Sequence, residues 1–176
     1  KGRLLFGIGA GYLVQEFQAL GINFEERGAR TDEYIDAIRE LWTSTKPEFA
    51  GQFVNYKGIQ SRPLAYQNGG PPVIVGGTSE AAYRRAIQKG HGWYGFALNI
   101  ASSQESIDAI RSLSDSTDRG TELGELEISI TPRVPLTDEI VKQFEDMGVS
   151  RLILLQTGKN EDQMLEYIDQ VAKDFF

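Results

Sequence analysis

The sequence predicts an α/β protein built on a parallel sheet, and three observations support this class. Short apolar runs typical of strands alternate with segments whose apolar residues recur at helical spacing. Two runs, Val73–Val75 and Leu152–Leu155, are continuously apolar, as in strands that are covered on both faces. The connections are short, and strands joined through helices run parallel in one sheet. At 176 residues, we expect one domain over residues 1–176.

Five segments have the composition of strands. In chain order they are Arg3–Gly9, Pro72–Gly76, Gly92–Leu98, Leu126–Thr131 and Arg151–Gln156. Between the first two, residues 49–58 alternate like a short hairpin, and an extended loop over residues 62–72 leads into the second strand.

Helical patterns lie between and after these strands. They are predicted over residues 27–42 and 80–89, and around Ile107, Ile140 and Leu165. Thr78 or Ser79 is a suitable N-cap for the second of them, and Thr137 for the fourth. Ser102 and Glu105 match the capping box and are predicted to begin the third.

Two parallel α/β architectures remain open from this pattern. An open doubly wound sheet is complete with five strands, whereas a (β/α)₈ barrel needs three further units and about 250 residues. The chain begins at Lys1 and not at Met, and Leu4–Phe6 already lies within an apolar run. We therefore expect about five C-terminal βα units of a TIM barrel, in a fragment that lacks the N-terminal part.

Composition excludes several classes of function. A net charge of −7 without a Lys/Arg cluster argues against a nucleic-acid partner. With no cysteine and one histidine, no metal site is predicted. No apolar stretch approaches the roughly 20 residues of a membrane span, and no signal peptide is apparent, so we expect a cytoplasmic protein without a membrane partner.

The most informative motif is the glycine pair after the second predicted strand. Gly76 and Gly77 let the backbone approach a ligand closely, and Thr78 or Ser79 then begins a helix. A strand, a glycine pair and a helix N-terminus together present free N–H groups to an anion, for which a cofactor or substrate phosphate is the best candidate. A tight turn without a ligand is the alternative.

The first predicted strand also ends in glycines, at Gly7, Gly9 and Gly11. Their spacing is G-x-G-x-G and not the G-x-G-x-x-G of dinucleotide-binding proteins. The acidic residues about 20 positions on, Asp32 and Glu33, lie in a helical pattern where the fingerprint requires a strand end. We therefore reject dinucleotide binding and interpret this strand end as free of side chains, so that a flat ligand can lie close.

Nine short motifs occur together in one order. They are Gly7-Ile8-Gly9-Ala10-Gly11-Tyr12, Glu16-Phe17, Gly21, Arg27-x-x-Arg30-x-x-Glu33, Leu41-Trp42, Phe49-x-Gly51-x-Phe53, Pro63-x-x-x-Gln67, Pro71-Pro72-Val73-Ile74-Val75-Gly76-Gly77 and Gly90-x-Gly92-Trp93. In this order they resemble the luciferase-like monooxygenase superfamily, especially its deazaflavin (coenzyme F-420) dependent branch. The resemblance covers Leu4 to about Phe96, and the later units agree in pattern only.

The resemblance implies a (β/α)₈ barrel, with this chain as units four to eight and the cofactor at the carboxyl mouth of the strands. It places the loop after the first strand along the cofactor, with Gln15 or Glu16 reaching the cofactor's polar chain. It places the glycine pair at the ribityl-phosphate end. The implied cofactor-binding residues are Ala10, Gly11, Tyr12, Gly76, Gly77, Thr78 and Ser79.

The activity implied is that of an oxidoreductase acting on a small organic substrate. Coenzyme F-420 would support hydride transfer, and reduced FMN would support monooxygenation. One alternative is an FMN-dependent monooxygenase supplied by a partner reductase. Another is a non-catalytic flavin-binding or truncated relative, whose open sheet edge would seek a partner. We expect a homodimer, and we assign no catalytic residue because such groups often come from the early strands.

Other candidate residues have competing structural interpretations. His91, the one histidine, is placed beside the presumed mouth, with an incidental structural role as the stronger interpretation. Arg133 and Lys159 follow strands, and either could hold an anion or form a surface ion pair. Glu33 with Arg30 is interpreted as a structural pair on one helix face. Trp42, Trp93 and Phe96 are interpreted as packing residues of the core or the barrel mouth.

Overall fold

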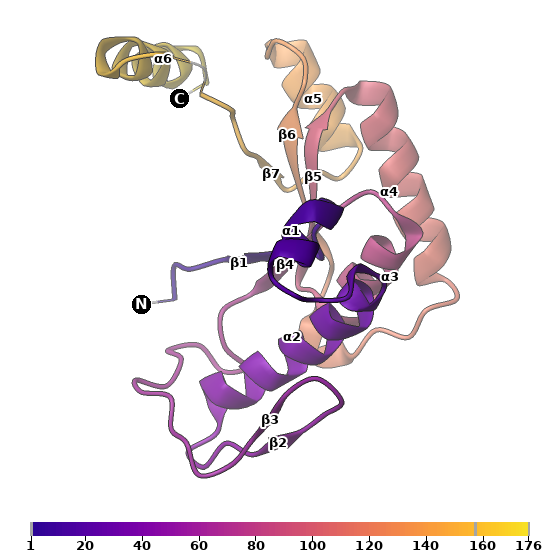
Figure 1. Cartoon of the computed structure of the whole chain (residues 1–176). Coiled ribbons are helices and arrows are strands. Elements are labelled where there is room, and N and C mark those ends of the chain that lie inside the picture. The colour runs from indigo at the N-terminus through magenta and orange to yellow at the C-terminus, as the bar shows by residue number, and fades with distance from the viewer. Residues whose placement is uncertain (1, 157, 176) are drawn as a thin grey trace.

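A computed structural model describes residues 2–156 and 158–175 and shows a five-stranded parallel sheet as the centre of the fold (Figure 1). The strands lie in the order β1-β4-β5-β6-β7. Their bounds are β1 (Phe6–Ile8), β4 (Val73–Gly76), β5 (Gly92–Leu98), β6 (Glu127–Pro132) and β7 (Arg151–Leu152). This order follows the chain without the reversal that defines a doubly wound sheet. The described strands therefore have the arrangement of a (β/α)₈ barrel, as predicted.

The described residues form six helices and two 3₁₀ turns. Their bounds are α1 (Val14–Ala19), α2 (Arg27–Thr43), α3 (Glu80–Lys89), α4 (Ile100–Ser114), α5 (Asp138–Asp146) and α6 (Glu161–Phe175), with 3₁₀ turns η1 (Phe24–Glu26) and η2 (Thr121–Leu123). The predicted hairpin consists of β2 (Phe49–Ala50) and β3 (Asn55–Tyr56) and lies beside α2 (Figure 1). Within the described ranges, no helix is both long and apolar enough to cross a bilayer.

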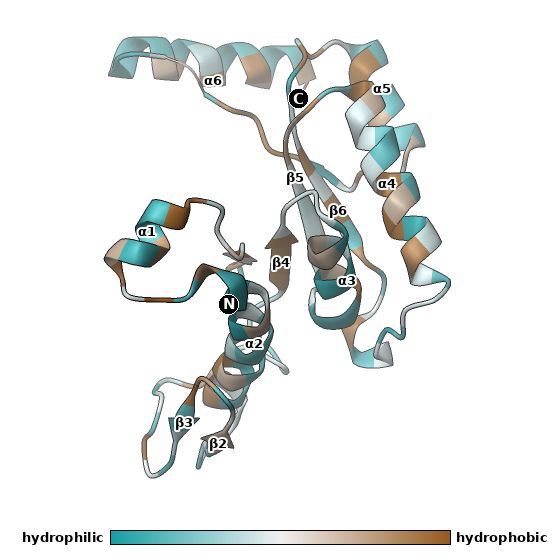
Figure 2. Ribbon diagram, turned by 45° about the vertical axis from the view of Figure 1, so that its right-hand side comes forward, coloured by the Kyte–Doolittle hydropathy of each residue, from teal (hydrophilic) through white to brown (hydrophobic). Residues whose placement is uncertain are grey.

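The core lies between the sheet and helices α3, α4 and α5. Alternate strand residues point into it because successive side chains on a strand face opposite sides. Val73 and Val75 of β4 and Trp93 of β5 are almost fully enclosed there, together with Ile87 of α3 and Phe144 of α5. In Figure 2, β4 is accordingly brown, whereas α3, α4 and α5 carry mixed apolar and polar faces. Burial of this apolar layer holds the sheet and the helices together.

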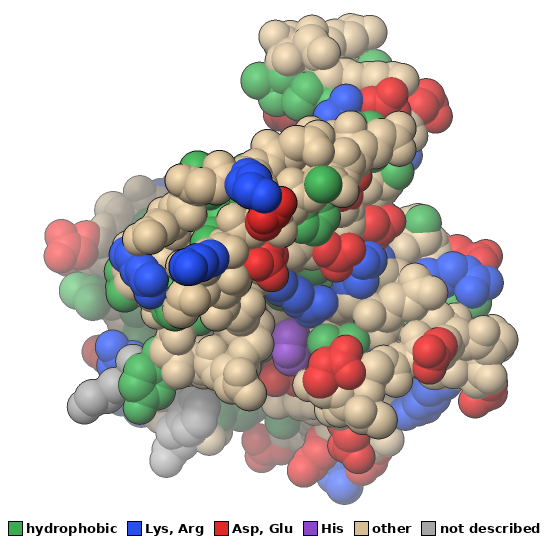
Figure 3. Space-filling view, turned by 90° about the horizontal axis from the view of Figure 1, so that it is seen from below, with side chains coloured by type: hydrophobic (Ala, Val, Ile, Leu, Met, Phe, Trp, Pro, Cys, Tyr) green, Lys and Arg blue, Asp and Glu red, His purple; other side chains and the backbone are tan. Residues whose placement is uncertain are grey.

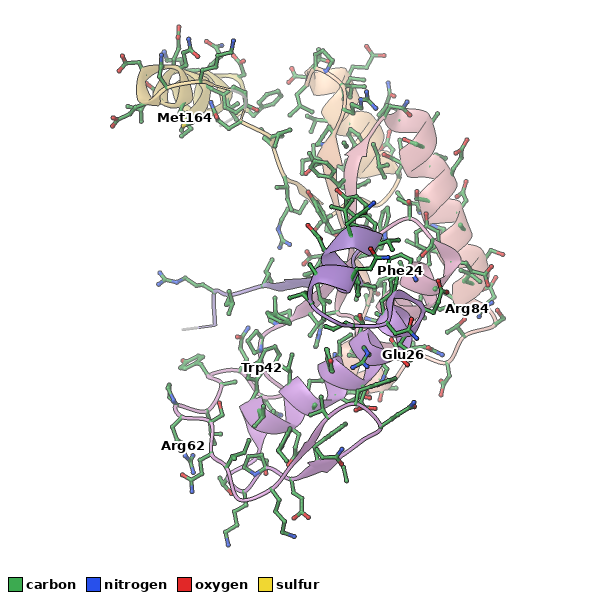
Figure 4. All side chains as sticks on the ribbon, in the orientation of Figure 1. Phe24, Glu26, Trp42, Arg62, Arg84 and Met164 are labelled. Atoms are coloured by element: carbon green, nitrogen blue, oxygen red, sulfur yellow. The ribbon has the colours of Figure 1, made fainter. Side chains whose placement is uncertain are left out.

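The opposite face of the sheet is open. Ile153 and Leu155, which follow β7, are 42% and 58% exposed. Helix α6 extends away from the other helices, and Met164 marks its position in Figure 4. The prediction that Leu152–Leu155 is covered on both faces was therefore wrong for the described residues. Strand β7 also ends at Leu152 and not at Gln156, because only its first two residues pair with β6.

The helix ends test the predicted caps. Ser79 accepts a hydrogen bond from the Ala82 N–H, and Thr137 accepts one from the Ile140 N–H, so both caps are confirmed. The predicted start at Ser102 was wrong. Asn99 caps α4 and Ser102 is its third residue, in a capping box that begins three positions earlier. The Asn99 side chain accepts the Ser102 N–H and the Ser102 hydroxyl accepts the Asn99 N–H, so this box satisfies N–H groups at the start of α4.

Strand β1 and helix α1 also differ from the expectation. Only Phe6–Ile8 of the predicted Arg3–Gly9 is a strand, because pairing with β4 begins at the Phe6 N–H. Leu4 and Leu5, which precede it, are exposed. Helix α1 was not predicted, since its six residues are too few to show a helical stripe.

The predicted Arg30–Glu33 pair is replaced by two other interactions. Arg30 bonds to Glu26 at 2.7 Å, whereas the Glu33 carboxylate accepts the N–H groups of Gln52, Phe53 and Val54. Burial acts to raise the pKa of Glu33, but these three donors and the Arg30 charge outweigh it and hold the pKa below its ordinary value. Glu33 is thus structural, as predicted, although its partner is the β2–β3 turn.

Candidate functional site

The loops that follow β1 and β4 meet at the carboxyl edge of the sheet. Because the two strands are parallel neighbours, with Ile8 opposite Val75, their ends lie side by side. A cavity of about 780 Å³ opens between these loops, and we call it the glycine-loop cavity. All seven residues proposed from the sequence line it: Ala10, Gly11, Tyr12, Gly76, Gly77, Thr78 and Ser79.

One wall of the glycine-loop cavity is the start of α3. Gly77 has a φ of +117°, a backbone conformation that requires glycine, and a Cβ there would lie 3.1 Å from the Ala82 Cβ. Ser79 then caps the helix. Among the described residues, the backbone N–H groups of Thr78, Ser79, Glu80 and Ala81 have no acceptor. The helix therefore presents free donors and the positive end of its dipole at the cavity.

The loop after β1 forms the second wall. Gly11 has a φ of +82°, and a Cβ there would lie 2.8 Å from the Phe17 ring, so α1 packs directly against this turn. Tyr12 is 82% exposed. Gln15 and Glu16 belong to α1, and neither lines the cavity. The expectation that Gln15 or Glu16 reaches the cofactor's polar chain is therefore not supported by the lining of the cavity.

The third wall comes from η1 and α2 and was missed by sequence reasoning. Phe24 of η1 lines it (Figure 4), and the Arg27 guanidinium lies 3.8 Å from the centre of that ring. Arg85 of α3 also lines the cavity although it is only 6% exposed. One feature of the sequence could have identified Arg85 as a site residue. It is a charged residue that borders the buried stripe of an amphipathic helix.

Arg85 is held in a fixed orientation. Its Nε and Nη2 donate to the two carboxylate oxygens of Asp32 at 2.6 and 3.1 Å, and Nη2 also donates to the Gly28 carbonyl. Its Nη1 makes no hydrogen bond within the described residues. A bidentate pair fixes the plane of the guanidinium. Its remaining donors are thus available at the cavity wall.

A second cavity, of about 490 Å³, occupies the open face of the sheet, and we call it the inner-face cavity. Gly9 and Gly76 line both cavities, so the two adjoin at the ends of β1 and β4. Its lining is mainly apolar, including Ile74, Tyr94 and Ile153. One elongated ligand with an anionic end and an apolar end would match this pair of cavities.

His91 was placed beside the mouth, and this was wrong. It precedes β5 and therefore lies at the amino edge of the sheet, opposite the glycine-loop cavity. Its Nδ1 accepts the Val73 N–H at 3.1 Å. The histidine is the purple side chain between charged groups in Figure 3. The role favoured from the sequence, a structural or incidental one, fits these contacts.

Arg133 and Lys159 do not join the site. Neither lines the glycine-loop cavity, and neither forms an ion pair within the described residues. The Lys159 N–H donates to Gln163 at the start of α6. Phe96 is 59% exposed and lies in the irregular last part of β5, where the pairing with β6 shifts and Ala97 has a φ of +55°. Phe96 therefore lies outside the core, whereas Trp93 is a core residue as predicted.

Comparison with known proteins agrees with this architecture. A profile of the luciferase-like monooxygenase family matches residues 1–163, and the chain belongs to that family. This confirms the resemblance seen in the motifs. A solved coenzyme F420 dependent tetrahydromethanopterin reductase from Methanopyrus kandleri has the same fold, with a TM-score of 0.71 and 11% identity. The match covers 96% of this chain and 73% of that one.

Two curated relatives give the level of sequence similarity. An uncharacterized protein of Mycobacterium tuberculosis is 28% identical over 152 residues, which are 86% of this chain and 51% of the relative. An FMNH(2)-dependent dimethylsulfone monooxygenase of Pseudomonas putida is 25% identical over 126 residues, which are 70% of this chain and 35% of that enzyme. The chain thus spans about half the length of these relatives, or less.

Proposed function

We propose that this chain supplies the phosphate end of a flavin-type cofactor site to an oxidoreductase that acts on a small organic substrate. The cofactor is reduced FMN or the deazaflavin coenzyme F-420. The observation that carries the proposal is the glycine-loop cavity, where the loops after two adjacent strands bring together the seven residues proposed from the sequence. This position, at the carboxyl ends of parallel strands, is where barrels of this class bind their ligands.

The residues present fit a phosphate. The start of α3 offers four backbone N–H groups that have no acceptor in the described part of the chain, and the helix dipole favours an anion there. Arg85, whose charge is shared with Asp32, adds a fixed donor, since its Nη1 has no acceptor within the described residues. Gly77 has no side chain in the space a phosphate would fill. We assign the phosphate to Gly76, Gly77, Thr78 and Ser79, and the adjoining polar chain to the loop of Ala10, Gly11 and Tyr12.

The reaction itself belongs to the ring of the bound cofactor, which supplies hydride transfer or oxygen activation. The mainly apolar inner-face cavity adjoins the glycine loops at Gly9 and Gly76, where a ring can lie against the backbone. Gly7 and Gly9 leave open space on this side, because a Cβ at either position would meet nothing within 4 Å. The two glycines let the ring lie flat on the backbone, next to the apolar side chains that line this cavity.

Two cofactor classes follow from the comparisons. The Pseudomonas relative is named an FMNH(2)-dependent monooxygenase, which supports FMN and monooxygenation. The Methanopyrus neighbour is named as dependent on coenzyme F420, which supports hydride transfer. An FMN enzyme of this type would receive reduced flavin from a partner reductase.

Fluorescence titrations with FMN and with coenzyme F-420 test the proposal and separate the two classes. Each cofactor is titrated in its oxidised and reduced forms, next to its ring system without the phosphate. We expect one of the two to bind at least tenfold more tightly than its phosphate-free form, since a hydrogen-bonded charge contributes that much. If neither cofactor binds, or if the phosphate adds nothing to binding, the proposed function is wrong.

A further inference from the structure

The buried indole of Trp93 contacts the loop after β4 from the side of the core. Trp93 lies in β5 and is 0% exposed, with Tyr83 of α3 packed edge-on against it at 5.7 Å. Its Nε1 donates a hydrogen bond of 2.8 Å to the carbonyl oxygen of Gly77. The core of the protein is therefore linked directly to the backbone of the glycine-loop cavity.

This bond fixes the direction of one peptide group. In a planar trans peptide, the carbonyl oxygen and the N–H point in opposite directions. Because the Gly77 oxygen points into the core toward Trp93, the N–H of the same peptide, that of Thr78, points out toward the cavity. The φ of +117° at Gly77 makes this orientation accessible to glycine and costly for other residues.

We propose that Trp93 is a positioning residue for phosphate recognition, which orients the Gly77–Thr78 peptide so that the Thr78 N–H faces the anion. The proposal rests on the proposed function of the cavity. Without the indole donor, the Gly77 oxygen loses its partner in an apolar region. Rotation of the peptide toward water then relieves this cost, but it turns a carbonyl oxygen toward the phosphate and removes a donor from it.

The second tryptophan provides a matched control. Trp42 lies in the last turn of α2 and packs edge-on against Phe6, with the ring centres 5.1 Å apart. Its indole N–H has no acceptor among the described residues, and the residue does not line the glycine-loop cavity. Trp42→Phe therefore makes the same chemical change next to the same core and leaves the Gly77 peptide alone.

The experiment compares Trp93→Phe and Trp42→Phe by titrating FMN and riboflavin, which differ only in the phosphate. The measured quantity is the ratio of the riboflavin Kd to the FMN Kd. We expect Trp93→Phe to lower this ratio by about tenfold, the value of one hydrogen bond to an anion, and to leave the riboflavin Kd nearly unchanged. Trp42→Phe should leave the ratio at its wild-type value.

A second variant covers the case in which Trp93→Phe does not fold. The chain has two tryptophans, so Trp93 is the one that remains in the Trp42→Phe variant. Incorporating benzothienylalanine in place of tryptophan in that variant therefore replaces Trp93 alone. This analogue keeps the shape of the indole and has sulfur where the N–H was. The same tenfold fall in the ratio is expected.

The outcomes separate this inference from the function on which it rests. If wild-type protein shows no preference for FMN over riboflavin and F-420 titration also shows no phosphate effect, the proposed function fails and the inference fails with it. If F-420 alone shows the effect, the ratio is measured with that cofactor and its phosphate-free ring. If wild type shows the preference and both Trp93 variants keep it, the positioning role is overturned and the function stands.

Discussion

The two ends of helix α3 differ in whether other parts of the protein form hydrogen bonds with their backbone groups. At its carboxyl end, Arg119 donates to the carbonyl oxygens of Ala86, Ile87 and Gly90 at 3.3, 2.7 and 2.8 Å. Arg39 donates to the carbonyl of Lys89. At its amino end, four backbone N–H groups among the described residues have no acceptor. One end of the helix is satisfied by the protein's own side chains, and the other borders the glycine-loop cavity, where we propose that a phosphate binds.

This difference follows the direction of the strands. The carboxyl end of α3 lies at the amino edge of the sheet, where connections enter the strands, and charged side chains there complete the hydrogen bonding. In barrels of this kind, that edge contributes stability and the carboxyl edge holds the ligand site. Changes at the two ends of α3 should therefore separate stability from binding.

Arg119→Met should have the largest effect. It removes one hydrogen bond from each of five carbonyl oxygens, including those of Leu123 and Gly124, and we expect a loss of about 3 kcal/mol in the free energy of unfolding. Urea denaturation measures it, and the FMN Kd of the folded variant should not change. Arg84→Met is the control, since Arg84 forms an exposed pair with Glu80 worth at most about 0.5 kcal/mol and only one further hydrogen bond, of 3.3 Å to the Thr117 hydroxyl. Equal losses in both variants would contradict the comparison.

Gly77→Val should have the largest effect on binding. A branched side chain at a φ of +117°, with a Cβ 3.1 Å from that of Ala82, displaces the turn and fills the phosphate position. We expect the FMN affinity to fall by about a hundredfold, or about 2.7 kcal/mol. Gly58→Val is the matched control, with a φ of +72° and open space around it in the hairpin region. Unchanged affinity in Gly77→Val would show that the phosphate lies elsewhere.

Ser79→Ala should affect both properties modestly. Loss of the N-cap destabilises the protein by about 1 kcal/mol and loosens the turn that holds the free donors. Thr137→Ala removes the equivalent cap of α5, away from the cavity, and should cost a similar amount of stability. Thermal unfolding and FMN titration of both variants check this. The comparison predicts a several-fold weaker FMN affinity for Ser79→Ala only.

His91 gives the smallest expected effect, through pH. Burial, and after it the charges of Arg39 and Arg119, hold the pKa of His91 below its ordinary value of 6.5. The unfolded chain therefore binds the proton more readily, so stability is full above about pH 6.5 and falls as the pH drops toward the folded pKa. His91→Asn keeps an acceptor for the Val73 N–H, and its stability should be flat over this range. Denaturation at several pH values between 7 and 5.5 measures the difference.

Much of the fold could be predicted because its signals are local. Helix α3 was predicted at its observed bounds, since an N-cap, an amphipathic stripe and a glycine follow one another within twelve residues. Strands β4 and β5 agree to within one residue because apolar and aromatic runs bounded by Gly, Pro or Asn mark strands. The ends of β1 and β7 were not predictable, because they depend on which residues find a pairing partner.

The site shows the same division. The glycine loops were predicted because positive φ angles and close approach require glycine, as Gly11 and Gly77 confirm. Arg85 was missed because its partner Asp32 is 53 positions away, and the burial of a charge is decided by that pairing. His91 was misplaced because the sequence pattern was assigned to the wrong edge of the sheet. The residue comes directly before β5 and therefore lies at the amino edge, whereas the site lies at the carboxyl edge.

The sequence by itself determined the alternation of strands and helices, the two glycine turns and the membership of the luciferase-like family. Each of these depends on residues that are close together in the sequence. Only the tertiary structure decided which end of α3 is left open, and that Trp93 holds the Gly77 carbonyl. Those properties depend on hydrogen bonds between distant segments, and a hydrogen bond is made only when packing of the sheet and helices brings donor and acceptor within about 3 Å.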